Sequence, residues 1–329
     1  MLTFADPEII RMAREDFIAV AGDDWYQRRR QDPEGEFFRK VADQGPRKGQ
    51  GGSTRQGIYC LTADGKLLIY RNAGQNPDVM REVLRQGLRE WKKLPENRRK
   101  PGAVKIEDLS KTDQRYTRTP PAGGLIVNVY TRILDREGKT GYCKGTCKTQ
   151  GGDRAARDHL WLTAKEWKSL IPDEPKKGDQ APLPAAIAKR ILCFHLIDNT
   201  RGEPPMWTPE QIRQHKLTLT VEEVSATKIG LRLDGSALLA TKADVNKADR
   251  GFDVRLLGHI DLDRTRKAIT RFDVVAVGEH WGQGTYTGGA RPGRTPLGVA
   301  FELSRGDSAA DLVPPQGARE LSRYLGQAR

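Results

Sequence analysis

The sequence predicts an α+β protein with a mixed N-terminal part and a C-terminal domain of antiparallel strands. Between residues 251 and 304, apolar and polar side chains alternate in short runs, which is typical of half-buried strands. In the first 95 residues, residues that commonly cap helices are followed several times by apolar residues spaced at helical intervals, which predicts helices there. The 329 residues are enough for two or three domains, which we expect at 1–95, 96–210 and 211–329.

Composition and charge argue against a membrane-spanning protein and against a nucleic-acid-binding protein. Hydrophobic residues make up 37% of the chain and charged residues 30%, and no run reaches the roughly eighteen apolar residues of a membrane span. The net charge of +13 is spread evenly: residues 1–118 hold 24 Lys and Arg against 18 Asp and Glu, and the remainder 32 against 25. A nucleic-acid interface gathers positive charge on one face, so this distribution argues against one. No signal-peptide pattern opens the chain, which predicts a cytoplasmic location by default, or export if the N-terminus is trimmed.

Helices and strands alternate in the expected domain 1–95. Capping residues followed by proline start two helices, at Asp6 and Asn76. Asp64-Gly65 is a strong hairpin turn between two apolar runs. The expected elements are a helix from residue 7, a strand at 17–20, a helix at 33–44, a loop at 45–55, strands at 58–61 and 67–70, and a helix from 77 to 91.

This order of elements, with GIYCLTADGKLLIYRNAG at its centre, resembles the C-terminal half of a thioredoxin-like domain over about residues 6–94. Redox-active members of that family carry Cys-x-x-Cys, whereas Cys60 is the only cysteine here, in apolar surroundings that predict burial. Gly57-Ile58 stands where the family usually has a cis-proline. The resemblance therefore implies a degenerate domain without its first strand and without thiol–disulfide exchange. Its sheet would keep an open edge, which could pair with another part of the chain or with a second copy in a homo-oligomer.

The sequence predicts that residues 96–210 form a linker followed by a connecting region of both helices and strands. We expect strands at 125–134 and 159–162, a helix opened by a capping box at Thr163 and Glu166, and a helix at 184–198. His195 stands three residues before Asp198, a spacing that suits a base and its orienting group. The apolar character of that helix favours a histidine at the edge of the core instead.

Cys143 and Cys147 form a C-x-x-x-C pair, with His159 twelve residues later. These three residues could hold copper or zinc, although a structural zinc site usually has two close ligand pairs. Free thiols or a local disulfide are the simpler interpretation, and a catalytic pair is the third alternative.

The C-terminal part predicts five to seven strands, enough for a small barrel or sandwich. Its most suggestive segment is the loop from residue 280 to 294. The candidate ligand-binding residues in it are His280, Trp281, Tyr286, Arg291 and Arg294. Aromatic rings and arginine side chains suit an acidic or sugar-like ligand. We expect four of these side chains to converge on one concave surface beside the sheet: Trp281, Tyr286, Arg291 and Arg294.

No nucleophile, carboxylate pair or complete metal set stands out in the sequence. We therefore expect a non-catalytic binding or scaffold protein, without a required cofactor, that takes a small ligand or a protein partner. The alternative is a thiol- or metal-dependent redox protein or metal carrier that uses Cys143 and Cys147.

Overall fold

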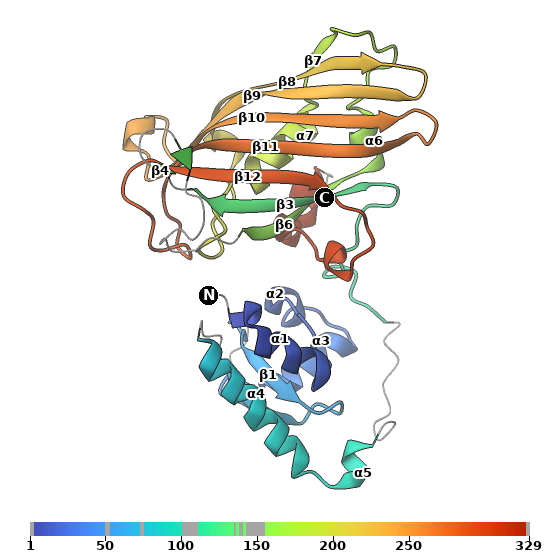
Figure 1. Ribbon diagram of the computed structural model, residues 1–329. Coiled ribbons are helices and arrows are strands. Elements are labelled where there is room, and N and C mark those ends of the chain that lie inside the picture. The colour runs from blue at the N-terminus through green and yellow to red at the C-terminus, as the bar shows by residue number, and fades with distance from the viewer. Residues whose placement is uncertain are drawn as a thin grey trace. The chain divides into compact units, whose positions relative to one another are not determined.

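The structure is a computed structural model that describes residues 3–49, 53–72, 76–100, 111–134, 136–137, 141–142 and 155–326. The chain divides into two compact units, Met1–Arg118 and Thr119–Arg329. Figure 1 shows the helices and strands of both units.

Helices surround a two-stranded antiparallel sheet in the smaller unit. Its elements are a 3₁₀ turn η1 (Thr3–Ala5), α1 (Pro7–Glu15), α2 (Asp24–Gln27), α3 (Pro33–Ala42), β1 (Ile58–Leu61), β2 (Leu67–Arg71), α4 (Pro77–Lys92) and α5 (Glu96–Arg99). The expected helix starts are confirmed, because the side chains of Asp6 and Asn76 accept hydrogen bonds from the first backbone amides of α1 and α4. The turn between β1 and β2 is also confirmed, with Gly65 at a φ of 84° that suits glycine.

The strand expected at residues 17–20 is wrong. These residues form no regular element, and Ile18 and Val20 are 96% and 85% exposed. A strand needs a neighbour to complete its hydrogen bonds, and in the described part of this unit β1 and β2 pair only with each other. The apolar composition of this run therefore indicated a strand, but no described strand of this unit pairs with it.

The core of the smaller unit lies between α1, α4 and β1. Its buried side chains are Ile9, Met12, Cys60, Met80, Val83 and Leu84. Cys60 is only 4% exposed, which confirms the expected burial. A Cβ on Gly87 of α4 would stand 3.0 Å from the Cys60 sulfur, so the helix lies directly on the thiol.

Cys60 is expected to resist labelling in the folded protein. Burial raises the pKa of its thiol to about 11, so little reactive thiolate exists at neutral pH. A chain with Cys143, Cys147 and Cys193 replaced by serine isolates this thiol. A colorimetric thiol reagent should react with it slowly at pH 8 and quickly after denaturation. Fast labelling without denaturant would contradict the burial.

The larger unit is built on one eight-stranded antiparallel sheet with the order β6-β3-β12-β11-β10-β9-β8-β7. Its strands are β3 (Leu125–Ile133), β6 (Ala156–Leu162), β7 (Gln180–Pro182), β8 (Ile212–Val224), β9 (Lys228–Ala240), β10 (Arg250–Asp263), β11 (Ala268–Gly282) and β12 (Thr295–Leu303), while β4 (Arg136–Glu137) and β5 (Gly141–Tyr142) form a separate pair. The end strands β6 and β7 do not pair with each other, so the sheet is open and the expected barrel is wrong.

Helical segments cover one face of this sheet (Figure 1). They are α6 (Ala164–Lys168), α7 (Ala185–Arg190) and the π-helical turn η2 (Ile191–His195), with α8 (Leu321–Leu325) near the C-terminus. Short 3₁₀ turns complete the unit: η3 (Pro209–Gln211), η4 (Val245–Lys247), η5 (Ala309–Leu312) and η6 (Gln316–Glu320). Among the described residues, the layer facing the sheet is therefore helical, and a second sheet of a sandwich is not seen there.

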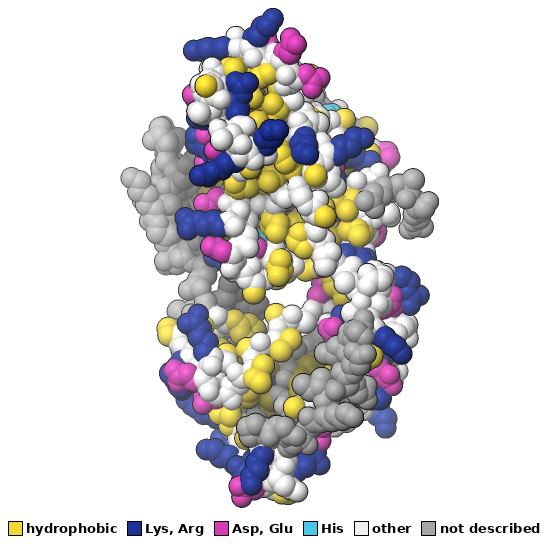
Figure 2. Space-filling model, turned by 90° about the vertical axis from the view of Figure 1, so that its right-hand side faces the viewer, with side chains coloured by type: hydrophobic (Ala, Val, Ile, Leu, Met, Phe, Trp, Pro, Cys, Tyr) yellow, Lys and Arg dark blue, Asp and Glu magenta, His cyan; other side chains and the backbone are white. Residues whose placement is uncertain are grey.

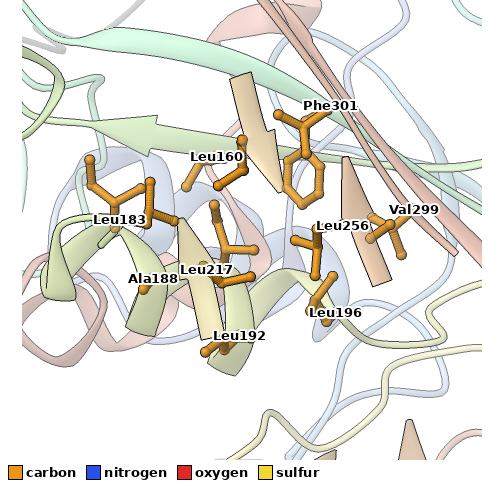
Figure 3. Close-up of a cluster of buried hydrophobic side chains, with 14 of the residues drawn as sticks. Leu160, Leu183, Ala188, Leu192, Leu196, Leu217, Leu256, Val299 and Phe301 are labelled. Atoms are coloured by element: carbon orange, nitrogen blue, oxygen red, sulfur yellow. The ribbon is translucent and has the colours of Figure 1, made fainter. Parts of the chain in front are cut away.

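The core of the larger unit lies between this face and the helices. Alternate residues of the strands point into it, as the period-two pattern predicted. Figure 3 shows side chains of β8, β10 and β12 meeting Ala188, Leu192 and Leu196 of the helical layer; the strand residues are Leu217, Leu256, Val299 and Phe301.

The expected boundary at residue 210 runs through this sheet. Both β3 and β6 come from the stretch interpreted as a connector, yet β3 pairs along β12 and β6 pairs along β3. Local sequence patterns identify strands but not their distant partners, so these two strands could not be assigned to the sheet beforehand.

Each end of the sheet is protected against further pairing. The outward backbone of β6 is bonded by side chains: the Tyr324 hydroxyl accepts from the Trp161 amide at 3.1 Å, and Arg190 Nη1 donates to the Trp161 carbonyl at 2.8 Å. At the other end, β7 is three residues long and contains Pro182. Short edges, proline and covered backbone are recognised ways to stop edge-to-edge association.

Charged side chains are dispersed on the face that Figure 2 shows. Lys and Arg stand among hydrophobic and acidic side chains in both units and form no continuous basic patch there. Within the described ranges, no helix has the length and apolar character needed to cross a membrane.

Candidate functional site

A small cavity lies where β11 ends, beside residues 198–201 and the segment 282–291. Charged and aromatic residues in its lining are Asp198, Arg201, His280, Trp281 and Arg291, and the other lining residues are Ile133, Gly282, Ala290, Thr295 and Leu297. Its volume is about 10 Å³, roughly the space of one water molecule. The cavity can therefore admit one atom-sized group, and a whole sugar ring does not fit.

Asp198 and Arg201 form a buried ion pair at this cavity. Arg201 Nε donates to Asp198 Oδ2 at 2.8 Å, and both side chains are almost fully buried. The remaining donors of Arg201 hold the loop that follows β11, through the carbonyls of Gly282, Thr287 and Gly288. Gly282 has a φ of 79°, and a Cβ there would stand 1.9 Å from the Asp249 carbonyl oxygen. The loop can leave the sheet in this direction only because this residue is glycine.

His280 is a buried histidine in the lining of the cavity. It is 6% exposed, and no described residue forms a hydrogen bond with either ring nitrogen. Burial, opposed by Asp198 and aided by the guanidinium groups of Arg201, Arg250 and Arg291, lowers its pKa to about 4. The imidazole is therefore neutral at pH 7 and offers one donor and one acceptor.

Positive charge exceeds negative charge around the imidazole. Arg250 is 5% exposed, lies 3.9 Å from the ring centroid of Trp207 and donates to the Pro205 carbonyl at 2.7 Å. Burial lowers the pKa of Arg250 to about 10, which leaves it cationic at neutral pH. It forms no ion pair with a described carboxylate. The guanidinium groups of Arg201, Arg250 and Arg291 thus act on His280 against the carboxylate of Asp198.

The structure brings together some of the sequence-predicted ligand-binding residues. His280, Trp281 and Arg291 line the cavity. Arg291 also donates to the carbonyls of Leu134 at 2.7 Å and Pro296 at 2.8 Å, so it ties the loop to the ends of β3 and β12.

Tyr286 and Arg294 lie outside the lining. Tyr286 is 74% exposed, and its backbone bridges to Glu203. The guanidinium of Arg294 lies 4.2 Å from the ring centroid of Trp281, whose Nε1 donates to the Ala248 carbonyl. Because Trp281 is only 9% exposed, it presents no open ring on which a sugar could stack. Of the four residues expected to converge, only Trp281 and Arg291 therefore line the same cavity.

Sequence reasoning missed Arg201 and Arg250, and it considered Asp198 only as a partner for His195. Asp198 pairs with Arg201 instead, three residues later in the sequence. The three-residue spacing between Asp198 and Arg201 was the only feature of the neighbouring sequence that indicated this ion pair. Arg250 opens β10, and its position near His280 follows from the alignment of β10 beside β11, where Phe252 stands opposite His280.

His195 belongs to a second buried cluster, at the edge of β6. Its Nε2 lies 3.0 Å from the Tyr324 hydroxyl, and its Nδ1 lies 3.4 Å from Asp158 Oδ2. Next to it, Arg190 forms a bidentate ion pair with Glu166, at 2.6 and 2.5 Å. Four of these side chains are buried and Glu166 is nearly so, and the cluster joins α6, α7, η2 and α8 to the sheet. Its arrangement is that of a structural network.

The expected metal ligands are only partly described. Cys143 and Cys147 lie outside the described residues. His159 is buried on β6, opposite Asn128 of β3. Within the described ranges, no group of three or more histidine, cysteine or acidic side chains is placed to hold a metal ion.

Comparison with known proteins adds no relationship: no family model, no curated protein and no solved structure matches the chain.

Proposed function

We propose that this is a non-catalytic binding protein whose larger unit binds a compact anionic group beside His280. The observation that carries the proposal is a buried, neutral imidazole without a hydrogen-bond partner among the described residues, in a cavity with an excess of positive charge. A neutral imidazole can donate to an anion, and nearby guanidinium groups stabilise negative charge.

The size of the cavity defines the ligand class. With about 10 Å³ available, the entering group is one oxygen of a carboxylate or phosphate, while the remainder of the ligand stays outside. Of the two ligand classes considered from the sequence, the acidic one is therefore better supported than the sugar-like one. The thiol- or metal-dependent alternative has no supporting observation in the described residues.

For the smaller unit we propose a scaffold role, as a degenerate thioredoxin-like domain. The order α3, β1, a tight turn, β2 and α4 supports this assignment, as expected from the resemblance. The buried Cys60, with its raised thiol pKa, supports a role without redox chemistry.

Binding of acetate or phosphate is expected to raise the pKa of His280 by about one unit, since a nearby negative charge favours the imidazolium form. The measurement is an NMR titration of the imidazole signals with increasing acetate, phosphate or, for comparison, glucose. His280→Gln identifies the His280 signal and should abolish the response.

The matched control is His259→Gln, because His259 is a half-exposed histidine on β10 near Glu222. This variant should respond to the anions as the wild type does. If neither anion moves the His280 signals, the proposed binding function is wrong. A response to glucose alone would favour a sugar ligand instead.

A further inference from the structure

The helices cover one face of the eight-stranded sheet, and the opposite face exposes apolar side chains at its centre. On that face the strand register aligns side chains in rows that cross the strands. The central row, called the middle row below, contains Leu257, Val275 and Ala300 on β10, β11 and β12. Leu257 and Val275 are 47% and 50% exposed. Exposed apolar groups that lie together in this way are typical of a surface that contacts another protein.

A row of cations lies on one side of the middle row. It contains Lys216, Arg255 and Arg132 on β8, β10 and β3, aligned by the register of the strands between them. No described residue forms an ion pair with these three, and Arg132 Nε is buried without a hydrogen-bond partner. The carboxylates of the next row, Asp253 and Glu279, do not pair with them either. This basic row can therefore receive a carboxylate from outside the chain.

Carboxylates lie on the other side of the middle row. Asp273 and Glu302 stand opposite each other on β11 and β12, and both are exposed. Glu302 forms no ion pair with a described residue. The basic side chains nearby are already paired: Arg271 with Asp273 at 2.6 Å, and Arg232 and His259 with Glu222 at 2.9 and 3.4 Å. The face therefore has an excess of positive charge on one side of the middle row and of negative charge on the other.

We propose that a second copy of this chain packs the same sheet face against this one, around a twofold axis that runs along the middle row and across the strands. Residues of the middle row then meet their counterparts in the other copy, so that Leu257 and Val275 are removed from water. The contact is a packing of two sheets, with their strands aligned to within about 30°.

Charge determines the direction of the axis. An axis across the strands turns the basic row of each copy toward the acidic side of the other, whereas an axis along the strands would set basic row against basic row. Seen across the interface, Arg255 of one copy lies one strand away from Asp273 of the other, and Arg132 one strand away from Glu302. Neighbouring strands are about 4.8 Å apart and packed sheets about 10 Å apart, distances that extended arginine side chains can span.

Two like-charged contacts oppose the association at the ends of the middle row. Asp234 on β9 and Arg157 on β6 each approach the same residue of the other copy. The crossing angle of about 30° between packed sheets moves the ends of the row apart. Asp234 is also paired with Arg232 within its own chain, at 3.5 Å. We therefore expect the apolar centre and the complementary rows to outweigh these two contacts.

The face is large enough for a dimer. β8 to β11 contain 13 to 15 residues each, and β12 contains 9. At about 3.3 Å per residue and about 4.8 Å per strand, these five strands present roughly 1,000 Å². A standard interface buries about 800 Å² on each partner. Because the twofold contact uses the same face on both copies, it closes as a dimer and does not continue as a fibre.

Sedimentation equilibrium of the full chain from about 1 µM to about 1 mM tests the dimer. The wild type should approach twice its monomer mass across this range. Val275→Lys should remain a monomer, because it places two like charges at the twofold axis. Arg255→Glu should weaken the dimer, and adding Asp273→Lys should restore it, because the two charges are then exchanged across the interface. All three positions are exposed, so each variant should fold, which circular dichroism verifies.

The matched control is Val20→Lys, which places the same charge on an 85% exposed valine of the smaller unit. This variant should dimerise as the wild type does. The proposal is overturned if the wild type stays monomeric at all concentrations, if Val275→Lys dimerises normally, or if Val20→Lys dissociates to the same extent. A double variant that dimerises no better than Arg255→Glu alone would overturn the proposed axis.

Discussion

Replacing Arg190 with methionine should lower the free energy of unfolding of the larger unit by about 3–5 kcal/mol, as is typical when one partner of a buried ion pair is removed. Arg190 is 2% exposed and donates to four acceptors: both oxygens of Glu166, the Trp161 carbonyl and the Tyr324 carbonyl. Methionine fills similar space but donates nothing. It leaves the mostly buried Glu166 carboxylate without its cation and exposes the edge of β6.

Urea unfolding followed by tryptophan fluorescence measures this effect, because four of the six tryptophans, Trp161, Trp167, Trp207 and Trp281, lie in the larger unit. The control is Arg232→Met, since the Arg232–Glu222 pair is partly exposed and should contribute at most about 1 kcal/mol. Equal losses in the two variants would contradict the assigned role of Arg190.

The Arg190 variant should also change the dependence of stability on pH. Although burial opposes it, the hydrogen bonds from Arg190 and Thr163 hold the pKa of Glu166 below its ordinary value. A lowered pKa means that the stabilisation is complete above the unfolded pKa, about 4.3, and is lost as the pH falls through the folded value. Arg190→Met should remove much of this contribution, so its stability should fall less steeply in acid.

Replacing Asp198 with asparagine should have a comparable effect on the larger unit, a loss of about 3–5 kcal/mol in the free energy of unfolding. The change preserves shape but leaves the buried Arg201 guanidinium without its carboxylate. It also weakens the two bonds that Asp198 accepts from Thr200. Since Arg201 holds the carbonyls of the loop after β11, that loop should become easier to cleave by protease.

The control for this variant is Asp253→Asn. Asp253 is an exposed carboxylate 3.9 Å from Arg294, so its replacement should cost at most about 1 kcal/mol. The pKa of Asp198 is lowered by Thr200 and Arg201 despite its burial, so its stabilisation is present above the unfolded pKa of about 3.9 and fades in acid. If both variants unfold at the same urea concentration, the ion pair does not stabilise the site.

Local structure was largely predictable because its signals lie in adjacent residues. The caps at Asp6 and Asn76, the Asp64-Gly65 turn and the capping box at Thr163 all have the expected geometry. Period-two alternation located the long strands of the larger unit. The failure at residues 17–20 has a physical cause, since a strand depends on a partner that the local sequence does not describe.

The site was less predictable because it is assembled from distant segments. His280 and Arg291 stood out as polar groups in a glycine-rich loop. However, a sequence cannot show that Arg291 donates to the carbonyls of Leu134 and Pro296. The sheet alignment that places Arg250 near the imidazole is equally invisible before folding, because the strands that determine it are not neighbours in the chain.

The position of β12 between β11 and β3 has a consequence during synthesis. β3 ends at Ile133, but its neighbour β12 is complete only at Leu303, 170 residues later. At about 5–20 residues per second, a ribosome needs on the order of 10–30 s to make that intervening chain. During this interval β3 and β6 have no central sheet to join, whereas β8 to β11 can pair hairpin by hairpin as they emerge. The nascent chain therefore carries an early strand pair, β3 and β6, whose neighbour in the sheet is one of the last strands to be made. Chaperone binding would be most useful during this interval.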